Sequence, residues 1–144
     1  MQTSTWFASL AKTVRSFINL LPIIIGMLLL TSLALVLFPR QLIDELFGHS
    51  ALMDSVIGAG LGSIAAGHPL ASYLIGGELL ERGVGLVAVT ALMVAWVTVG
   101  IVQLPAEGVL LGMRFALCRN LFNLFAAVAI AFLTLWTLPL VGLR

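Results

Sequence analysis

The stretch SVIGAGLGSIAAGHPLASYLIGG, Ser55–Gly77, decides the fold. Its 23 residues carry no charge, and a helix of about 20 residues crosses a bilayer core about 30 Å thick. Six glycines lie in it, and Pro69 stands near its centre. Pro69 has no amide hydrogen and moves His68 away from helical dihedral angles, while Gly67 adopts conformations that other residues avoid. The sequence therefore predicts a membrane-embedded helix interrupted at Gly67–Pro69, where protein or a water-filled cavity must surround the backbone.

The rest of the chain is equally apolar. Of 144 residues, 61% are hydrophobic and 9% charged, whereas soluble domains contain about 45–50% and about 25%. Three more charge-free windows have 24 residues each: Ser16–Pro39, Gly83–Ala106 and Asn120–Leu143. We therefore expect an all-α polytopic membrane protein with about four hydrophobic passes, located in a bacterial inner (cytoplasmic) membrane.

The N-terminal residues 1–15 precede this single transmembrane domain, residues 16–144. Trp6 and Phe7, with Lys12 and Arg15, suit an amphipathic lead-in at the lipid headgroups, and a frayed tail is the alternative. The apolar stretch after Arg15 exceeds the roughly 7–15 residues of a signal-peptide core, so we expect it to remain as a spanning helix.

A second interruption is predicted at Gln103-Leu104-Pro105-Ala106-Glu107, after the apolar run Val84–Val102. Two Gly/Pro-interrupted segments resemble the discontinuous helices from which transporters build their sites. The alternative is that Pro105 only ends a helix at the membrane interface. The following segment, Glu107–Arg119, is too short and charged for a lipid-exposed span, and it fits an interfacial helix or half of a broken one.

Positive charges do not orient the chain. Lys and Arg divide four to three between the two sides, whether Ser55–Gly77 crosses the membrane or returns as a re-entrant segment. Lys12 and Arg15 favour a cytoplasmic N-terminus. So small a bias is also what a protein inserting in both orientations would show.

The stretch Val56–Leu111 resembles one half of the predicted-permease family that includes the organoarsenical efflux permeases. The resemblance implies a permease fold, and since family members usually contain two such halves, it also implies a homo-oligomer or a second half-permease chain. The family's cysteine motif near the proline is replaced here by HPLAS, so an arsenical substrate is not expected. The resemblance rests on Gly58–Gly62, His68-Pro69-Leu70-Ala71-Ser72, Glu78-Leu79-Leu80, Gly83 to Leu86, and Ala88–Val97.

Polar groups inside a membrane are costly, so they are the candidate site residues. His68 could bind or relay a proton, or it could bond a carbonyl freed by Pro69. Glu107 could be a cation or proton site facing His68, or it could cap a helix. Asn123 could line a path or join helices, and Arg119 could hold an anion or extend to the headgroups. The predicted substrate-binding set is His68, Pro69, Ser72, Tyr73, Gln103, Glu107 and Asn123.

Gly58, Gly62 and Ala66 form a ridge of small residues at four-residue spacing, along which another helix can approach closely. The sequence does not say whether that helix belongs to the same chain or to a second one.

No catalytic, metal or nucleotide motif accompanies these residues, so we expect neither an enzyme nor a cofactor, and no nucleic-acid partner. The hypothesis is a permease or secondary-transporter subunit that moves a small solute between broken helices. The alternative is a non-transporting helical scaffold that docks a partner on the Gly58–Gly62 ridge.

Overall fold

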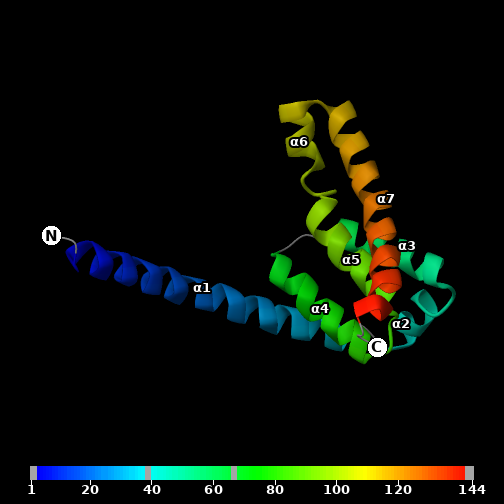
Figure 1. Ribbon diagram of the computed structural model, residues 1–144, viewed down its shortest axis with the longest axis horizontal. Coiled ribbons are helices and arrows are strands. Elements are labelled where there is room, and N and C mark those ends of the chain that lie inside the picture. The colour runs from blue at the N-terminus through cyan, green and yellow to red at the C-terminus, as the bar shows by residue number, and fades with distance from the viewer. Residues whose placement is uncertain (1–2, 38–39, 66–67, 142–144) are drawn as a thin grey trace. The chain divides into compact units, whose positions relative to one another are not determined.

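The computed structural model describes residues 3–37, 40–65 and 68–141, and it confirms the predicted all-α class, because these residues contain helices and no strand. They form two compact units, α1 and the remaining elements. The helices (Figure 1) are α1 Thr3–Leu37, α2 Arg40–Leu46, α3 Ala51–Ile64, α4 Pro69–Glu81, α5 Leu86–Thr98, α6 Leu104–Leu111, α7 Met113–Thr137 and the 3₁₀ helix η1 Leu138–Val141.

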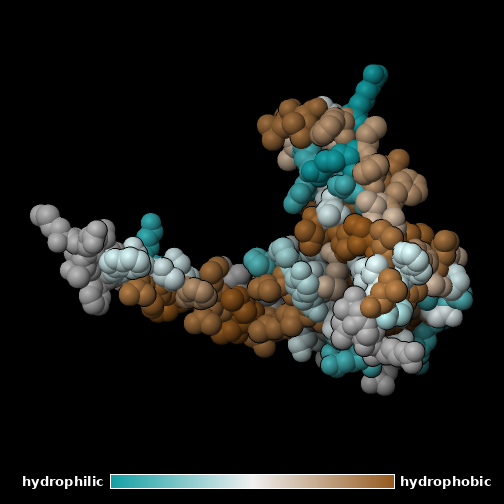
Figure 2. Space-filling model, viewed as in Figure 1, coloured by the Kyte–Doolittle hydropathy of each residue, from teal (hydrophilic) through white to brown (hydrophobic). Residues whose placement is uncertain are grey.

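Helix α1 is one continuous helix of 35 residues that contains Pro22. Residues 3–15 of the expected lead-in therefore belong to the same helix as the apolar stretch after Arg15, while residues 1 and 2 lie outside the described residues. Ser9–Leu30 is apolar and long enough to cross a membrane, and apolar side chains cover much of the visible surface of this helix (Figure 2). Its exposed apolar surface is what a lipid-facing helix presents.

Helices α3 and α4 both pack against α5, and the chain turns back between them. The turn before α3 and the turn after α4 line one hollow, to which Gly48, Asp54, Arg82 and Gly85 contribute. The beginning of α3 and the end of α4 therefore lie at the same end of the unit. Ser55–Gly77 folds back on itself, so the structure does not support the crossing expected for it.

Helices α3 and α5 run parallel and in close contact. A Cβ atom on Gly58 would lie 2.2 Å from the carbonyl oxygen of Ala88, and one on Gly62 would lie 2.2 Å from that of Leu92. The small-residue ridge therefore packs against α5 of the same chain. Its third member, Ala66, lies outside the described residues.

Helix α7 runs antiparallel to α5 and packs against both α5 and α6. Gly112, with φ of 92°, reverses the chain between α6 and α7, and glycine adopts such an angle at no steric cost. Helix α7 begins at Met113, seven residues before the predicted window, and it includes Arg119. The expected interfacial segment Glu107–Arg119 is thus divided at Gly112.

Among the described residues, α1 and α7 are long and apolar enough to span a membrane, within Ser9–Leu30 and Met113–Leu140. The window Gly83–Ala106 instead contains the 13-residue α5 and the start of the 8-residue α6. The core between α3, α5 and α7 is rich in small side chains, namely the buried Ala59, Ala91, Ala95, Ala127 and Ala131.

Candidate functional site

Both predicted interruptions occur, and they lie at the same level of the helical unit. Helix α3 ends at Ile64 and α4 begins at Pro69, while α5 ends at Thr98 and α6 begins at Leu104. The amide of Ile101 donates a hydrogen bond to the carbonyl oxygen of Ser63 at 3.5 Å. The end of α3 therefore meets the α5–α6 break directly.

The first interruption is organised by His68 and Pro69. Pro69 occupies the first turn of α4, where a missing amide hydrogen costs nothing. His68 caps this helix, because its Nδ1 accepts a hydrogen bond from the amide of Leu70 at 3.3 Å. The alternative expected for His68 was a bond to a carbonyl, and the structure shows a bond to an amide. Gly67, part of the predicted break, lies outside the described residues.

Ser72 and Tyr73 follow on α4 and have different surroundings. The Ser72 hydroxyl is buried and donates to the carbonyl oxygen of Pro69 at 2.7 Å, so it serves the helix backbone. Tyr73 is 60% exposed. Both residues line a hollow of about 370 Å³ between α4 and α5, together with Thr98 and Val97 at the end of α5.

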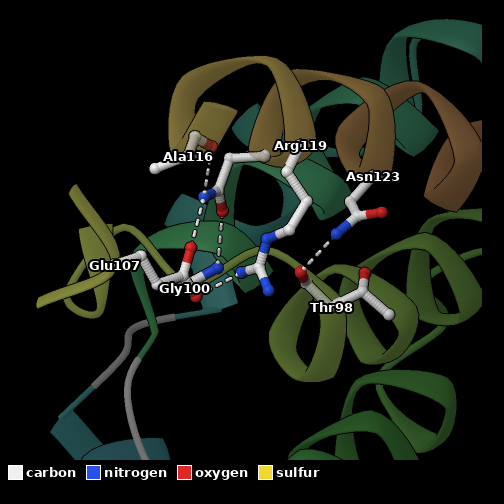
Figure 3. Close-up of polar contacts among 7 residues, drawn as sticks. Thr98, Gly100, Glu107, Ala116, Arg119 and Asn123 are labelled. Atoms are coloured by element: carbon white, nitrogen blue, oxygen red, sulfur yellow. Dashed lines mark hydrogen bonds and ion pairs between the residues drawn. The ribbon is translucent and has the colours of Figure 1, made fainter. Parts of the chain in front are cut away.

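Two asparagines of α7 bind the backbone at the second interruption (Figure 3). Asn120 Oδ1 accepts from the amide of Gly100 at 2.9 Å, and Asn123 Nδ2 donates to the carbonyl oxygen of Thr98 at 2.9 Å. Where a helix ends, its last carbonyls and the following amides lose their helical partners. Asn120 and Asn123 supply new partners to groups freed by the end of α5.

Glu107 lies beside this network and forms an ion pair with Arg119 (Figure 3). Its second oxygen accepts from Asn120 Nδ2 at 3.5 Å, and the same nitrogen donates to the carbonyl oxygen of Ala116 at 3.0 Å. The Glu107 side chain is 16% exposed and that of Arg119 is 36% exposed. Glu107 lies in the first turn of α6, as the capping hypothesis expected, but its carboxylate contacts α7.

The guanidinium of Arg119 is incompletely paired. Its Nε is buried and has no hydrogen-bond partner among the residues that the structure describes. A buried donor without a partner costs about 1–3 kcal/mol. The α5–α6 break therefore has one buried hydrogen-bond donor without a partner beside Glu107, among the residues that the structure describes.

Gln103, another predicted site residue, is exposed at the start of α6. Its side chain makes no capping bond, and its carbonyl oxygen accepts from the amide of Glu107 at 3.0 Å. Pro105 stands in the first turn of α6, so the break lies before the proline, at 99–103, a few residues earlier than predicted. Pro105 therefore lies at the beginning of α6, and α5 ends seven residues before it.

Sequence reasoning missed the pairing of Glu107 with Arg119. Glu107 and Arg119 lie on either side of Gly112, five residues before it and seven after it. A reversal at Gly112 brings such positions together on adjacent helices. The glycine between opposite charges in an apolar stretch is the sequence feature that could have predicted the pair.

No group of three or more His, Cys, Asp or Glu side chains in the described part of the chain could hold a metal ion. Comparison with family models, with curated protein sequences and with solved structures gives no match. The resemblance to the permease family therefore rests on the residues quoted for it above.

Proposed function

We propose that this protein is a membrane permease subunit that moves a small solute past the junction where the α3–α4 turn meets the α5–α6 break. The observation that carries the proposal is the contact between these two interruptions, marked by the bond from Ile101 to Ser63. Backbone outside regular helices is unstable in lipid unless it is sheltered by protein or lines a water-filled cavity. Two such segments at one level of a highly apolar chain are a feature of transporter sites.

The polar groups of the chain support the same location. Glu107, Arg119, Asn120 and Asn123 gather at the α5–α6 break, whereas the side chains around them are mostly apolar. Ionisable groups within membrane segments are rare and mark solute or proton pathways. In this proposal Glu107 and Arg119 supply an acceptor and a donor beside the path, and the asparagines hold the broken backbone in place.

The chain is proposed to act with a second half, either another copy or a second half-permease chain. The hollow at Ser72 and Tyr73 opens to the outside of the unit, and His68 and Tyr73 are exposed. Exposed polar side chains at this depth would be unfavourable against lipid. A second half would cover them and complete a sheltered path.

The ridge of Gly58 and Gly62 bears on the scaffold alternative. A scaffold that docked its partner there would need the ridge to be free, but α5 of the same chain covers it. The permease proposal is therefore the better supported of the two.

Transport is tested in proteoliposomes by stopped-flow light scattering after osmotic shifts with glycerol, urea, neutral amino acids, carboxylates and phosphate. An entrapped pH-sensitive dye reports protons in parallel. We expect at least one solute to enter faster than in protein-free vesicles, and we expect Glu107→Gln to abolish the difference. Glu81→Gln is the matched control, since Glu81 is exposed at the end of α4. Equal permeation by wild type and empty vesicles across the panel would count against transport.

A further inference from the structure

We propose that two copies of this chain assemble in opposite orientations across the membrane, meeting at the hollow between α4 and α5. The inference rests on the proposed function in one respect, namely that the unit is embedded in a membrane. It deepens that function by naming the second half as an inverted copy of this chain. Three observations carry it: the depth of the hollow, its openness and the distribution of positive charge.

The hollow lies near the middle of the unit. The 13 residues of α5 rise about 20 Å, which is about two thirds of a bilayer core about 30 Å thick. The hollow follows α5 from Thr90 to Thr98, and its central residue, Val94, is the ninth residue of α5. Val94 therefore lies about 13 Å from the start of α5, close to half the core thickness.

A position at mid-depth is required for contact between inverted copies. Copies in opposite orientation are related by a two-fold axis in the membrane plane, and this axis brings only mid-depth features of one copy against the same features of the other. The hollow meets this requirement. By contrast, the hollow at the Gly48 and Gly85 turns lies at one end of the unit, and inversion would carry it to the opposite side.

The hollow is also open and incomplete. Tyr73 and Val97 are each 60% exposed at its rim, and the Thr98 side chain is exposed. An inverted copy would place its own Tyr73 near this rim. The second copy thereby contributes a side chain to the site.

Positive charge favours neither orientation. The turns that flank α3 and α4 lie at one end of the unit, so Arg82 shares that end with Arg40, while Arg114 follows the reversal at Gly112. With Ser55–Gly77 as a re-entrant segment, the sequence count of Lys and Arg is four to three. A chain with so little bias inserts both ways, because Lys and Arg near the ends of the spans set orientation.

Accessibility labelling tests the two orientations without any transport assay. Cys118 is first replaced by serine, because it is exposed. Single cysteines at His49 and Met113, near opposite ends of the unit, are then treated with a membrane-impermeant maleimide in intact cells. Each signal is divided by the labelling after detergent lysis. We expect roughly half of the molecules to react at each position. Full labelling at one position with none at the other would overturn the proposal.

The meeting surface is tested by cross-linking Tyr73→Cys with Cu-phenanthroline in membranes. We expect a covalent dimer there and none for Phe122→Cys, a still more exposed position on α7. Absence of the Tyr73 dimer would overturn the proposed surface. A dimer accompanied by one-sided labelling would indicate parallel copies and would also overturn the inverted arrangement.

Charge-biased variants provide the sharpest test. Arg40→Gln with Val109→Lys favours one orientation, and Lys12→Gln with Arg15→Gln and Gln41→Lys favours the other. In the Tyr73→Cys background, each variant alone should lose the cross-link, and co-expression of both should restore it. Cross-linking by each biased variant alone would contradict the proposal. If the solute panel shows no transport while these results hold, the permease function fails and the inverted dimer stands.

Discussion

Two of the contacts that α5 makes are built on different physical principles. Along its length, α5 lies against α3 with backbone on backbone, because Gly58 and Gly62 have no side chains to keep the helices apart. At its end, α5 is held by side-chain amides of α7, which bind Gly100 and Thr98. The first contact depends on shape and the second on replacing lost hydrogen bonds. The first is expected to tolerate no added volume, and the second no loss of polar partners.

This difference predicts where function resides. Close packing of small residues gives a rigid contact without polar groups, which is well suited to a static wall. The junction at 99–103 combines irregular backbone, an ion pair and a buried unpaired donor on Arg119. Buried polar networks with an incomplete set of partners are found at functional sites more than in static cores.

The largest expected effect comes from Gly62→Leu. Its Cβ alone would lie 2.2 Å from the Leu92 carbonyl oxygen, so the helices must separate. Overpacking costs typically about 1–3 kcal/mol and more where backbone blocks relief, so we expect a loss of at least about 3 kcal/mol. Unfolding in mixed micelles at increasing SDS fraction measures the loss.

Gly77→Ala is the control for this prediction, because Gly77 is exposed on α4 with nothing within 4 Å of an added Cβ. It should be neutral or stabilising by up to about 1 kcal/mol, since alanine favours helix over glycine. Equal stability of the Gly62→Leu and Gly77→Ala variants would show that α3 and α5 are not in direct backbone contact.

The next effect separates the two asparagines of the junction. Asn120 is buried and joins Gly100, Ala116 and Glu107, whereas Asn123 is half-buried and joins Thr98. Asn120→Ala leaves buried groups unpaired and should cost about 2–3 kcal/mol, and Asn123→Ala about 1 kcal/mol. The same SDS titration measures both. A greater loss for Asn123 would reverse the assignment of Asn120 as the centre of the network.

Breaking the ion pair should have a smaller effect on stability. Glu107→Gln removes the charge but keeps the shape, and because Arg119 is 36% exposed, water compensates part of the loss. We expect a cost of about 1–2 kcal/mol for Glu107→Gln or Arg119→Gln. A double-mutant cycle measures the coupling, and the two costs should not add. Additive costs would show that the carboxylate and guanidinium do not interact.

The interruption at Pro69 could be predicted because proline and its preceding residue act locally, whatever surrounds them. The direction that the chain takes after Pro69 could not be predicted. Whether α4 continues through the unit or returns depends on where Gly76 packs, and a Cβ there would lie 2.9 Å from Met93 Sδ on α5. This contact joins residues far apart in the sequence, so no local pattern in Ser55–Gly77 contains it.

The candidate site could be predicted only in part, again because its contacts join residues that are far apart in the sequence. Glu107, Gln103 and Asn123 were selected because polar residues are rare in apolar segments, and Glu107 and Asn123 lie at the junction with polar partners. The partners themselves were not predicted, since they depend on the reversal at Gly112. Pro105 illustrates a further ambiguity, because a proline ends one helix or begins the next, and sequence alone does not separate the two.

The smallest expected effect tests His68, which has both a structural and a proposed functional role. Its Nδ1 caps α4 at the amide of Leu70, so His68→Ala should cost about 1 kcal/mol, typical of a lost cap. His68→Asn keeps a capping oxygen but cannot carry a proton, so its stability should equal that of wild type. If His68 only caps α4, His68→Asn retains solute entry; if it also relays a proton, both variants lose proton-coupled entry. The SDS titration and the vesicle dye assay together distinguish these outcomes, because only the second responds to proton transfer.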